Sequence, residues 1–267
     1  MRRWLVTVAC ALLADAQAAT AQLRASAAPL HAHATLTPVS LVGSRATMLL
    51  TVAVDPGWHI SWRRPGETGL PTRLAWSLPA GVRLMREVWP VPVVSRTPVG
   101  AQHTLEGEVP WLIEFSTDGT GSADRLIGVT LRYGVCRDVC IPEQQAVQGV
   151  LPGRDDPSAA VGAALRARLI VDGGPIAVRV TAGTLCLRVP AALPAGTTLD
   201  LIADAAAVGD AALPVTRRGA RGTVRLPPDA RLTQGTAVVL VAGAAAVAGT
   251  LDLRAPVPAC GPRPARR

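Results

Sequence analysis

Two of the five cysteines, Cys136 and Cys140, lie in the stretch Tyr133-Gly-Val-Cys-Arg-Asp-Val-Cys-Ile-Pro-Glu143. Two thiols held this close can form a redox couple, because exchange needs a second thiol that resolves the mixed disulfide. The same spacing suits a structural disulfide that closes a small loop at the end of a strand. Spacing alone leaves both interpretations open. The three intervening residues, and Pro142 two positions after Cys140, argue against a thioredoxin motif.

A metal site is a weaker interpretation of the same cysteines. A tetrahedral zinc site needs four ligands, and only Cys136 and Cys140 are close together in the chain. The four histidines are scattered at His31, His33, His59 and His103. His31 and His33 are expected in a mobile, solvated leader. We therefore predict no metal and no cofactor.

The N-terminus predicts the compartment. Arg2 and Arg3 precede an apolar stretch from Trp4 to Leu13, and small residues follow up to Ala21, which is the layout of a signal peptide over residues 1–21. The stretch is shorter than the roughly 20 residues that span a bilayer. We expect Cys10 to be removed with the signal, and the mature chain to reach the periplasm without inserting in the membrane. A disulfide can persist in that oxidising compartment.

The basic charge does not indicate a nucleic-acid partner. The net charge is +8 and the pI is about 10.7, yet the chain has no lysine and its arginines are spread along its length. One Tyr and one Phe offer little aromatic surface for stacking on bases. This composition excludes nucleic-acid binding as the leading function.

Short strand-like runs between turn residues predict an all-β protein. Strands are expected over residues 34–42, 46–54, 72–78, 82–88, 108–115, 127–133 and 145–151. Such a series is typical of an immunoglobulin-like β-sandwich, here over residues 22–153. A linker at 153–157 and a short helix over 158–169 are then expected to lead into a second, smaller β-sandwich domain.

The second domain is expected over residues 154–255, with strands at 176–180, 184–189, 198–203, 222–226, 236–241 and 248–253. The nearly continuous apolar run from 236 to 251 is divided by glycines and predicts a buried hairpin. Residues 256–267 are predicted to form a disordered tail. Cys186 lies in an apparent strand, and Cys260 in the tail could pair with it or with another chain.

Several motifs in the same order carry a family resemblance. They are Pro56 to Trp76, Leu78 to Gly81, Trp89-Pro90, Glu106 to Val109 and Val135 to Glu143. Together they resemble the periplasmic N-terminal domain of the DsbD family of protein-disulfide reductases, in its ScsB-like branch. The resemblance covers about residues 34–150. It implies an immunoglobulin-like fold in which Cys136 and Cys140 take electrons from a membrane partner and pass them to oxidised periplasmic proteins.

By analogy with the family, Cys140 is the nucleophile and Cys136 resolves. The chain lacks the transmembrane and thioredoxin domains of the full-length reductases, so we expect a periplasmic exchange protein, a component of a protein-disulfide reductase, that needs a separately encoded membrane electron donor of DsbD type. The alternative is a non-catalytic binding or assembly module, linked to copper tolerance or cytochrome c maturation, with a permanent disulfide.

The motif residues around the pair have structural and functional interpretations. Trp58 and Trp62 are spaced to share one face of a strand, where they would pack in the core or shield the disulfide. Arg63, Arg64 and Glu67 suggest a solvated surface turn. Arg137 would lower a thiol pKa and Asp138 would oppose it. Tyr133 and Glu143 could hydrogen-bond near the sulfurs or be structural.

Overall fold

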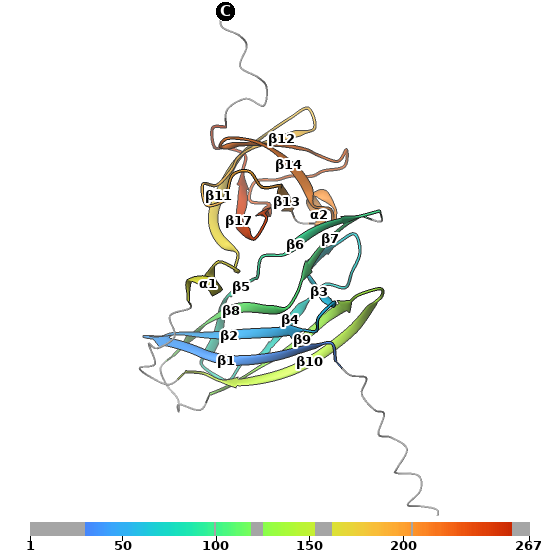
Figure 1. Ribbon diagram of the computed structural model, residues 1–267. Helices are drawn as coiled ribbons and strands as arrows, with labels where there is room; N and C mark the ends of the chain where they lie inside the picture. The colour runs from blue at the N-terminus through green and yellow to red at the C-terminus, as the bar shows by residue number, and fades with distance from the viewer. Residues whose placement is uncertain (1–29, 99, 119–124, 153–161, 204, 258–267) are drawn as a thin grey trace, which may run out of the picture. The chain divides into compact units, whose positions relative to one another are not determined.

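The computed structural model describes residues 30–98, 100–118, 125–152, 162–203 and 205–257. The predicted signal peptide, Cys10, Cys260, the linker and the last ten residues of the predicted tail lie outside these ranges. In the described part the secondary structure is almost entirely β, as predicted (Figure 1). No helix in these ranges is both long and apolar enough to cross a membrane.

Strands β1–β10 form two sheets, and together these make the predicted sandwich. The four-stranded sheet has the order β1-β2-β8-β5, and the other sheet has the order β10-β9-β3-β7-β6 with β4 also paired to β9. The bounds are β1 Ala32–Val42, β2 Arg45–Val54, β3 His59–Gly66, β4 Arg73–Ser77, β5 Val82–Val88, β6 Val93–Thr97, β7 Gly100–Leu105, β8 Glu108–Thr117, β9 Leu126–Cys136 and β10 Cys140–Val150.

Alternating side chains build the interior of the sandwich. In β2, Met48, Leu50 and Val52 are fully buried while the residues between them are more exposed, so this strand has one core face. The largest fully buried side chains of this domain are Trp62, Trp111, Phe115, Met48, Leu50, Ile60, Ile113, Ile127 and Leu131. Burial of this apolar surface is the main stabilising contribution.

Strands β11–β17 form a second β-structure. It is a closed barrel in the order β11-β12-β15-β14-β13-β16-β17, whereas the sequence predicted a second sandwich. The barrel closes because β11 pairs antiparallel with β12 along one part of its length and parallel with β17 along another. The bounds are β11 Val171–Thr181, β12 Thr184–Arg188, β13 Leu199–Ala203, β14 Leu213–Arg218, β15 Arg221–Arg225, β16 Ala237–Ala242 and β17 Ala245–Asp252.

Two short helices complete the described structure. The helix α1 covers Ala163–Arg166, within the predicted range of 158–169, and α2 covers Ala205–Val208. The predicted apolar hairpin is confirmed, since β16 and β17 pair in register around a turn at Gly243. Cys186 is buried in β12 and is disulfide-bonded.

Candidate functional site

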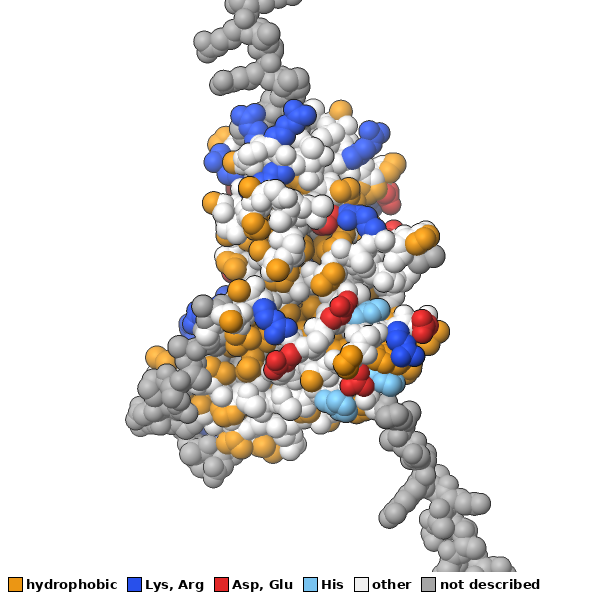
Figure 2. Space-filling model, in the orientation of Figure 1, with side chains coloured by type: hydrophobic (Ala, Val, Ile, Leu, Met, Phe, Trp, Pro, Cys, Tyr) orange, Lys and Arg blue, Asp and Glu red, His pale blue; other side chains and the backbone are white. Residues whose placement is uncertain are grey.

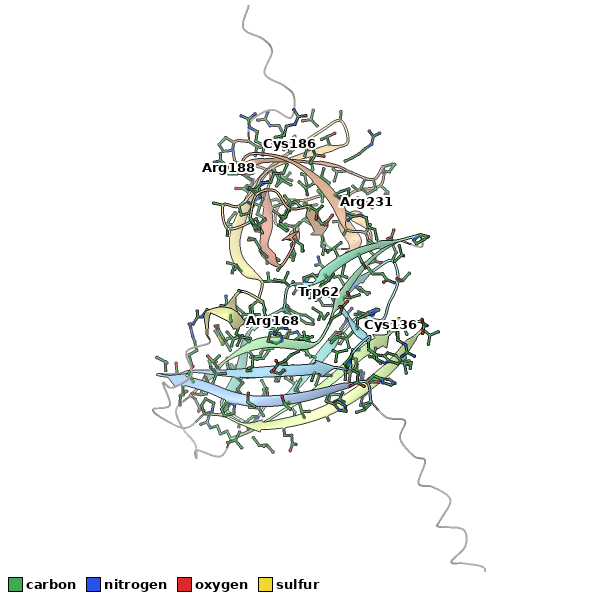
Figure 3. The ribbon with its side chains drawn as sticks, in the orientation of Figure 1. Trp62, Cys136, Arg168, Cys186, Arg188 and Arg231 are labelled. Atoms are coloured by element: carbon green, nitrogen blue, oxygen red, sulfur yellow. A yellow bond between two sulfur atoms is a disulfide. The ribbon has the colours of Figure 1, made fainter. Side chains whose placement is uncertain are left out.

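The two cysteines predicted to do chemistry form a disulfide at the end of the β9–β10 hairpin. Cys136 ends β9 and Cys140 begins β10, and the two residues lie directly opposite each other, with their Cα atoms 4.1 Å apart. The long antiparallel pairing from Leu126–Val150 to this point fixes the register. Figure 3 labels Cys136 at one end of the sandwich, and in the same view Figure 2 shows histidine, acidic and arginine side chains gathered at that end.

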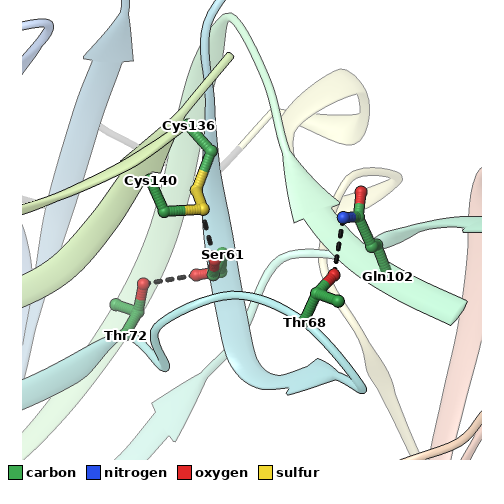
Figure 4. Close-up of a disulfide and its surroundings, with 6 residues drawn as sticks. All are labelled: Ser61, Thr68, Thr72, Gln102, Cys136 and Cys140. Atoms are coloured by element: carbon green, nitrogen blue, oxygen red, sulfur yellow. Dashed lines mark hydrogen bonds between the residues drawn. A yellow bond between two sulfur atoms is a disulfide. The ribbon is translucent and has the colours of Figure 1, made fainter. Parts of the chain in front are cut away.

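The two sulfur-bearing residues differ in their access to solvent. Cys136 is only 2% exposed, whereas Cys140 is exposed. On the buried side, the Ser61 hydroxyl of β3 lies 4.0 Å from the Cys136 Sγ, at the limit of a weak hydrogen bond to sulfur (Figure 4). An incoming thiolate can therefore reach the Cys140 Sγ far more easily than the Cys136 Sγ.

The connection between β3 and β4, residues 67–72, covers the sheet beside Cys136. β3 pairs with β9 only at His59 and Ile60. On the same side of β9, β4 pairs with residues Arg132 to Gly128. The 67–72 loop occupies the interval, where the Gly134 N–H donates to the Leu70 carbonyl at 3.2 Å. The Thr72 hydroxyl donates to the Ser61 carbonyl at 2.5 Å, which fixes the loop's end over β3 (Figure 4).

Gly134 is required by this close approach. A Cβ at position 134 would lie 2.8 Å from the Leu70 Cβ, closer than side-chain carbons pack. Gly69, whose φ is +109°, similarly brings the loop backbone against Ser61, because a Cβ there would meet the Ser61 Oγ at 2.6 Å. The loop therefore lies directly on the sheet and shields Cys136.

Three exposed apolar side chains belong to the segments next to the cysteines. Val139 and Ile141 flank Cys140 in the chain and are 67% and 38% exposed, and Leu70 of the 67–72 loop is 41% exposed. Exposed apolar residues in these segments could be covered by a partner protein that approaches Cys140.

Trp58 packs against the sandwich core that holds Trp62, as one of the two interpretations expected, and its ring also contacts Arg137 of the loop between the cysteines. Trp62 is fully buried in β3, as predicted, whereas Trp58 precedes the strand and is half-buried. The His31 ring stacks on Trp58 with 3.8 Å between centroids, and the Arg137 guanidinium lies 4.7 Å from the centroid of the same ring. The His31 Nδ1 also lies 3.3 Å from the Asp55 Oδ2. His31 is therefore part of the folded domain and not a solvated leader residue.

The charges next to the cysteines largely offset each other. Arg137 and Asp138 form an exposed ion pair with Nε and Oδ2 3.3 Å apart, so neither acts on the sulfurs as an isolated charge. Arg137 is also held over Trp58. The sequence predicted that Arg137 and Asp138 would have opposite effects on a thiol pKa, and the structure shows that these two charges pair with each other.

Tyr133 and Glu143 belong to a network that joins β10 to β1. The Tyr133 hydroxyl donates to the Glu143 Oε2 at 3.0 Å, and Gln145 donates to the Tyr133 hydroxyl. The Gln145 amide also bonds the β1 backbone, accepting from the Ala34 N–H at 3.1 Å and donating to the Ala32 carbonyl at 2.5 Å. The network joins this edge of the sandwich, which supports the structural interpretation of Tyr133 and Glu143.

Arg63 is not the solvated turn residue that the sequence suggested. Its guanidinium lies over the Trp62 ring and near the Trp89 ring, with Cζ 4.9 and 5.4 Å from the two centroids. Burial, with the nearby Arg64 charge, lowers the pKa of Arg63 to about 10 despite the opposing effect of Glu87. Glu67 is also engaged, since its carboxylate accepts from the Ala101 N–H.

His103 is a core histidine. It is fully buried, its Nδ1 lies 2.6 Å from the Arg64 carbonyl, and burial lowers the pKa of its ring below the usual value. Among the residues that the structure describes, no cluster of His, Cys, Asp and Glu is arranged to hold a metal ion.

Comparison with known protein families identifies the family of the sandwich domain. Residues 26–152 match the model of the N-terminal domain of the thiol:disulfide interchange protein DsbD, a domain with an immunoglobulin-like β-sandwich fold. With the fold and the cysteine pair in place, this segment belongs to the DsbD N-terminal family. The sandwich domain is thus a member of a thiol–disulfide exchange family. A search of curated proteins gave no match.

Solved structures support the fold over a longer part of the chain. The N-terminal periplasmic domain of ScsB from Proteus mirabilis is 21% identical, with a TM-score of 0.53, and the match covers 82% of this chain and 90% of that one. The collagen-binding subdomain of the Enterococcus faecalis surface protein ACE is 7% identical over 46% of this chain and 97% of that one, with a TM-score of 0.27. The second likeness is too low to support an inference.

Proposed function

We propose that this protein transfers reducing equivalents through the Cys136–Cys140 pair, taking electrons from a membrane reductase and giving them to oxidised periplasmic proteins. One observation supports this most strongly: the disulfide has one exposed and one buried cysteine at the end of the β9–β10 hairpin. An exposed cysteine is open to attack by the thiolate of another protein, which exchange requires. Membership of the thiol:disulfide interchange family supports the same conclusion.

The difference in exposure supports a different role for each cysteine. In the reducing step, a donor thiolate attacks the Cys140 Sγ, a mixed disulfide forms and Cys136 leaves as a thiolate. A second donor thiol then releases Cys140. In the forward step, the Cys140 thiolate attacks the substrate disulfide, and Cys136 attacks the Cys140 Sγ to release the reduced substrate.

The location and partners follow from the same assignment. A periplasmic location is supported by the similarity to the periplasmic domain of ScsB and by the signal-peptide layout of residues 1–21. The electron donor is proposed to be a membrane protein of DsbD type. The acceptors are disulfide-containing proteins, which would meet the exposed apolar residues of the segments next to the cysteines.

Single-cysteine variants test the proposal. Cys136→Ser keeps the exposed nucleophile and removes the resolving thiol, so it should accumulate mixed disulfides with its partners that run as reducible adducts on gels. Cys140→Ser is the matched control and should form few adducts, because its remaining thiol is buried. If neither variant forms adducts with periplasmic or membrane proteins, the proposed function is wrong.

A further inference from the structure

Four chemically active side chains lie in one row across the sheet that contains the disulfide. Cys140 is opposite Cys136, and Cys136 is opposite His59 on the next strand. Ile60 is opposite Leu105, so the next position places His59 opposite Glu106, just beyond β7. Residues directly opposite each other share one face of a sheet, with Cβ atoms about 4.5–5.5 Å apart. The row therefore reads Cys140, Cys136, His59 and Glu106.

The position of Cys136 creates a need for a proton acceptor. A thiol that is 2% exposed cannot readily pass its proton to solvent, yet it must become a thiolate to resolve a mixed disulfide. Ser61 lies 4.0 Å from its sulfur, but a serine hydroxyl does not accept a proton at neutral pH. His59 is the titratable side chain that the register places next to Cys136 on the side away from Cys140.

The surroundings of His59 keep its ring available as a base. Burial lowers its pKa, and the Glu106 carboxylate opposes this shift. Other charged groups lie nearby in the chain, but they are engaged elsewhere: Arg137 pairs with Asp138, and Asp55 pairs with His31. A neutral imidazole beside a carboxylate can take up a proton and be stabilised as the cation.

We propose that His59 is the acid–base partner of Cys136 and that Glu106 stabilises the protonated form of His59. In the resolving step, the Cys136 thiol gives its proton to His59 while its sulfur attacks the Cys140 Sγ and expels the substrate thiolate. In the reducing step, His59 returns that proton to the departing Cys136 thiolate. This inference rests on the proposed exchange function and adds the group that handles the proton.

Quenched-flow kinetics tests the proposal on the mature protein. The reduced protein is mixed with oxidised glutathione, quenched with acid at successive times and analysed by mass spectrometry for the mixed disulfide. His59→Gln should leave formation of the Cys140–glutathione adduct within about twofold and slow its resolution at least about tenfold. The pH dependence of resolution should also move upward, toward the ordinary thiol pKa of about 8.5.

Matched variants separate chemistry from structure. His33→Gln, an exposed histidine on β1, should resolve the adduct at the wild-type rate. Glu106→Gln should shift the acidic limb of the resolution profile to lower pH, because it removes a charge that raises the pKa of His59. Unchanged resolution and an unchanged pH profile in His59→Gln would overturn the inference.

A titration that needs no turnover distinguishes this inference from the proposed function. The pKa of His59, followed by NMR, should be at least about one unit higher in the reduced protein, since the Cys136 thiolate stabilises the imidazolium. Identical titrations in the oxidised and reduced states would also overturn it. If wild-type protein forms no glutathione adduct but His59 still responds to reduction, the exchange function fails while the coupling of His59 to Cys136 stands.

Discussion

The positions of individual side chains near the disulfide are determined by contacts across the sheet and not by residues adjacent in the sequence. Gly134 is the clearest example, because the absence of a side chain there allows Leu70 to lie on the sheet beside Cys136. Cys136 is buried two residues further along the same strand, and Cys140 is exposed, so we expect the loop to contribute to the burial of Cys136.

The first prediction concerns this contact. Gly134→Ala places a methyl group within 2.8 Å of the Leu70 Cβ, so the 67–72 loop must move away from the sheet. In the reduced protein carrying Cys140→Ser, we expect alkylation of Cys136 to become severalfold faster. Mass spectrometry of the alkylated peptide measures the rate.

Gly128→Ala is the matched control on the same strand. Its added carbon would make an ordinary contact at 3.4 Å with Ser77, so alkylation of Cys136 should keep its original rate. Equal rates in both alanine variants would show that the loop does not shield Cys136.

The second prediction uses the only tyrosine of the chain. Burial raises the pKa of Tyr133 well above its usual value of 10, and Glu143 adds to this while the Gln145 hydrogen bond opposes it. Above pH 10 the native state therefore holds a proton that the unfolded chain releases, and stability falls as the pH rises. Near-ultraviolet absorbance should show tyrosinate forming only well above pH 10 in the folded protein. Over this alkaline range the Tyr133→Phe variant should lose less stability than the wild-type protein. A tyrosinate titration with its midpoint at the usual pKa of 10 would contradict the buried network.

At the scale of elements, β1 and β10 belong to different sheets and are joined by a side chain. Gln145 on β10 bonds the backbone of Ala32 and Ala34 on β1. These backbone groups lie at the edge of a sheet, where losing a hydrogen-bond partner is costly when the groups are partly buried.

The third prediction follows from this bridge. Gln145→Leu leaves the β1 backbone groups and the Tyr133 hydroxyl without this partner, so the free energy of unfolding should fall by about 1–3 kcal/mol. Denaturant unfolding measures the change. Gln148→Leu, exposed on the same strand, should change stability by no more than about 0.5 kcal/mol. Comparable losses in the two variants would argue against the bridge.

The elements that the sequence predicted best are those with clean alternation. The run Met48 to Val54 predicted β2 nearly to its ends, because every second residue enters the core. The series of predicted strands omitted β3, because its polar Arg63-Arg64 and Pro65 break the pattern, although Trp58 and Trp62 were placed on one strand face. It also omitted β6 and β7, whose sequences VVSRT and GAQHTL lack a regular apolar alternation. The second domain was predicted as β-structure, but closure into a barrel depends on long-range pairing of β11 with β17.

Of the candidate site, only the two reactive cysteines could be predicted from the sequence. Cys136 and Cys140 were evident from their residue type and spacing, whereas Ser61, Leu70 and His59 were not. These neighbours come from β3 and its loop, more than 60 positions earlier, and no local pattern links them to the cysteines. Correct register for β3 against β9 is the signal that would have found them.

At the scale of the whole molecule, we expect the fold to persist without the disulfide. The sandwich interior is built from large, fully buried apolar side chains, and the Cys136–Cys140 bond closes only a small loop. This allows the pair to alternate between oxidised and reduced states in an intact domain.

The fourth prediction states the consequence for stability. Reduction of Cys136–Cys140 should lower the free energy of unfolding by about 2 kcal/mol, as expected for a loop of this size, and leave the β-structure intact. Circular dichroism and denaturant unfolding of Cys136→Ser/Cys140→Ser against the oxidised protein measure both quantities. Loss of the folded state in the double variant would indicate a structural staple.

The reduction potential of the Cys136–Cys140 pair is the most direct test of the central claim that this disulfide exchanges with other proteins. It is measured by equilibrating the mature protein in defined dithiol buffers, trapping free thiols and identifying the Cys136 and Cys140 peptides by mass spectrometry. We predict a potential of roughly −180 to −270 mV, the range of exchanging couples. A potential below about −300 mV would identify a permanent structural disulfide and contradict the account.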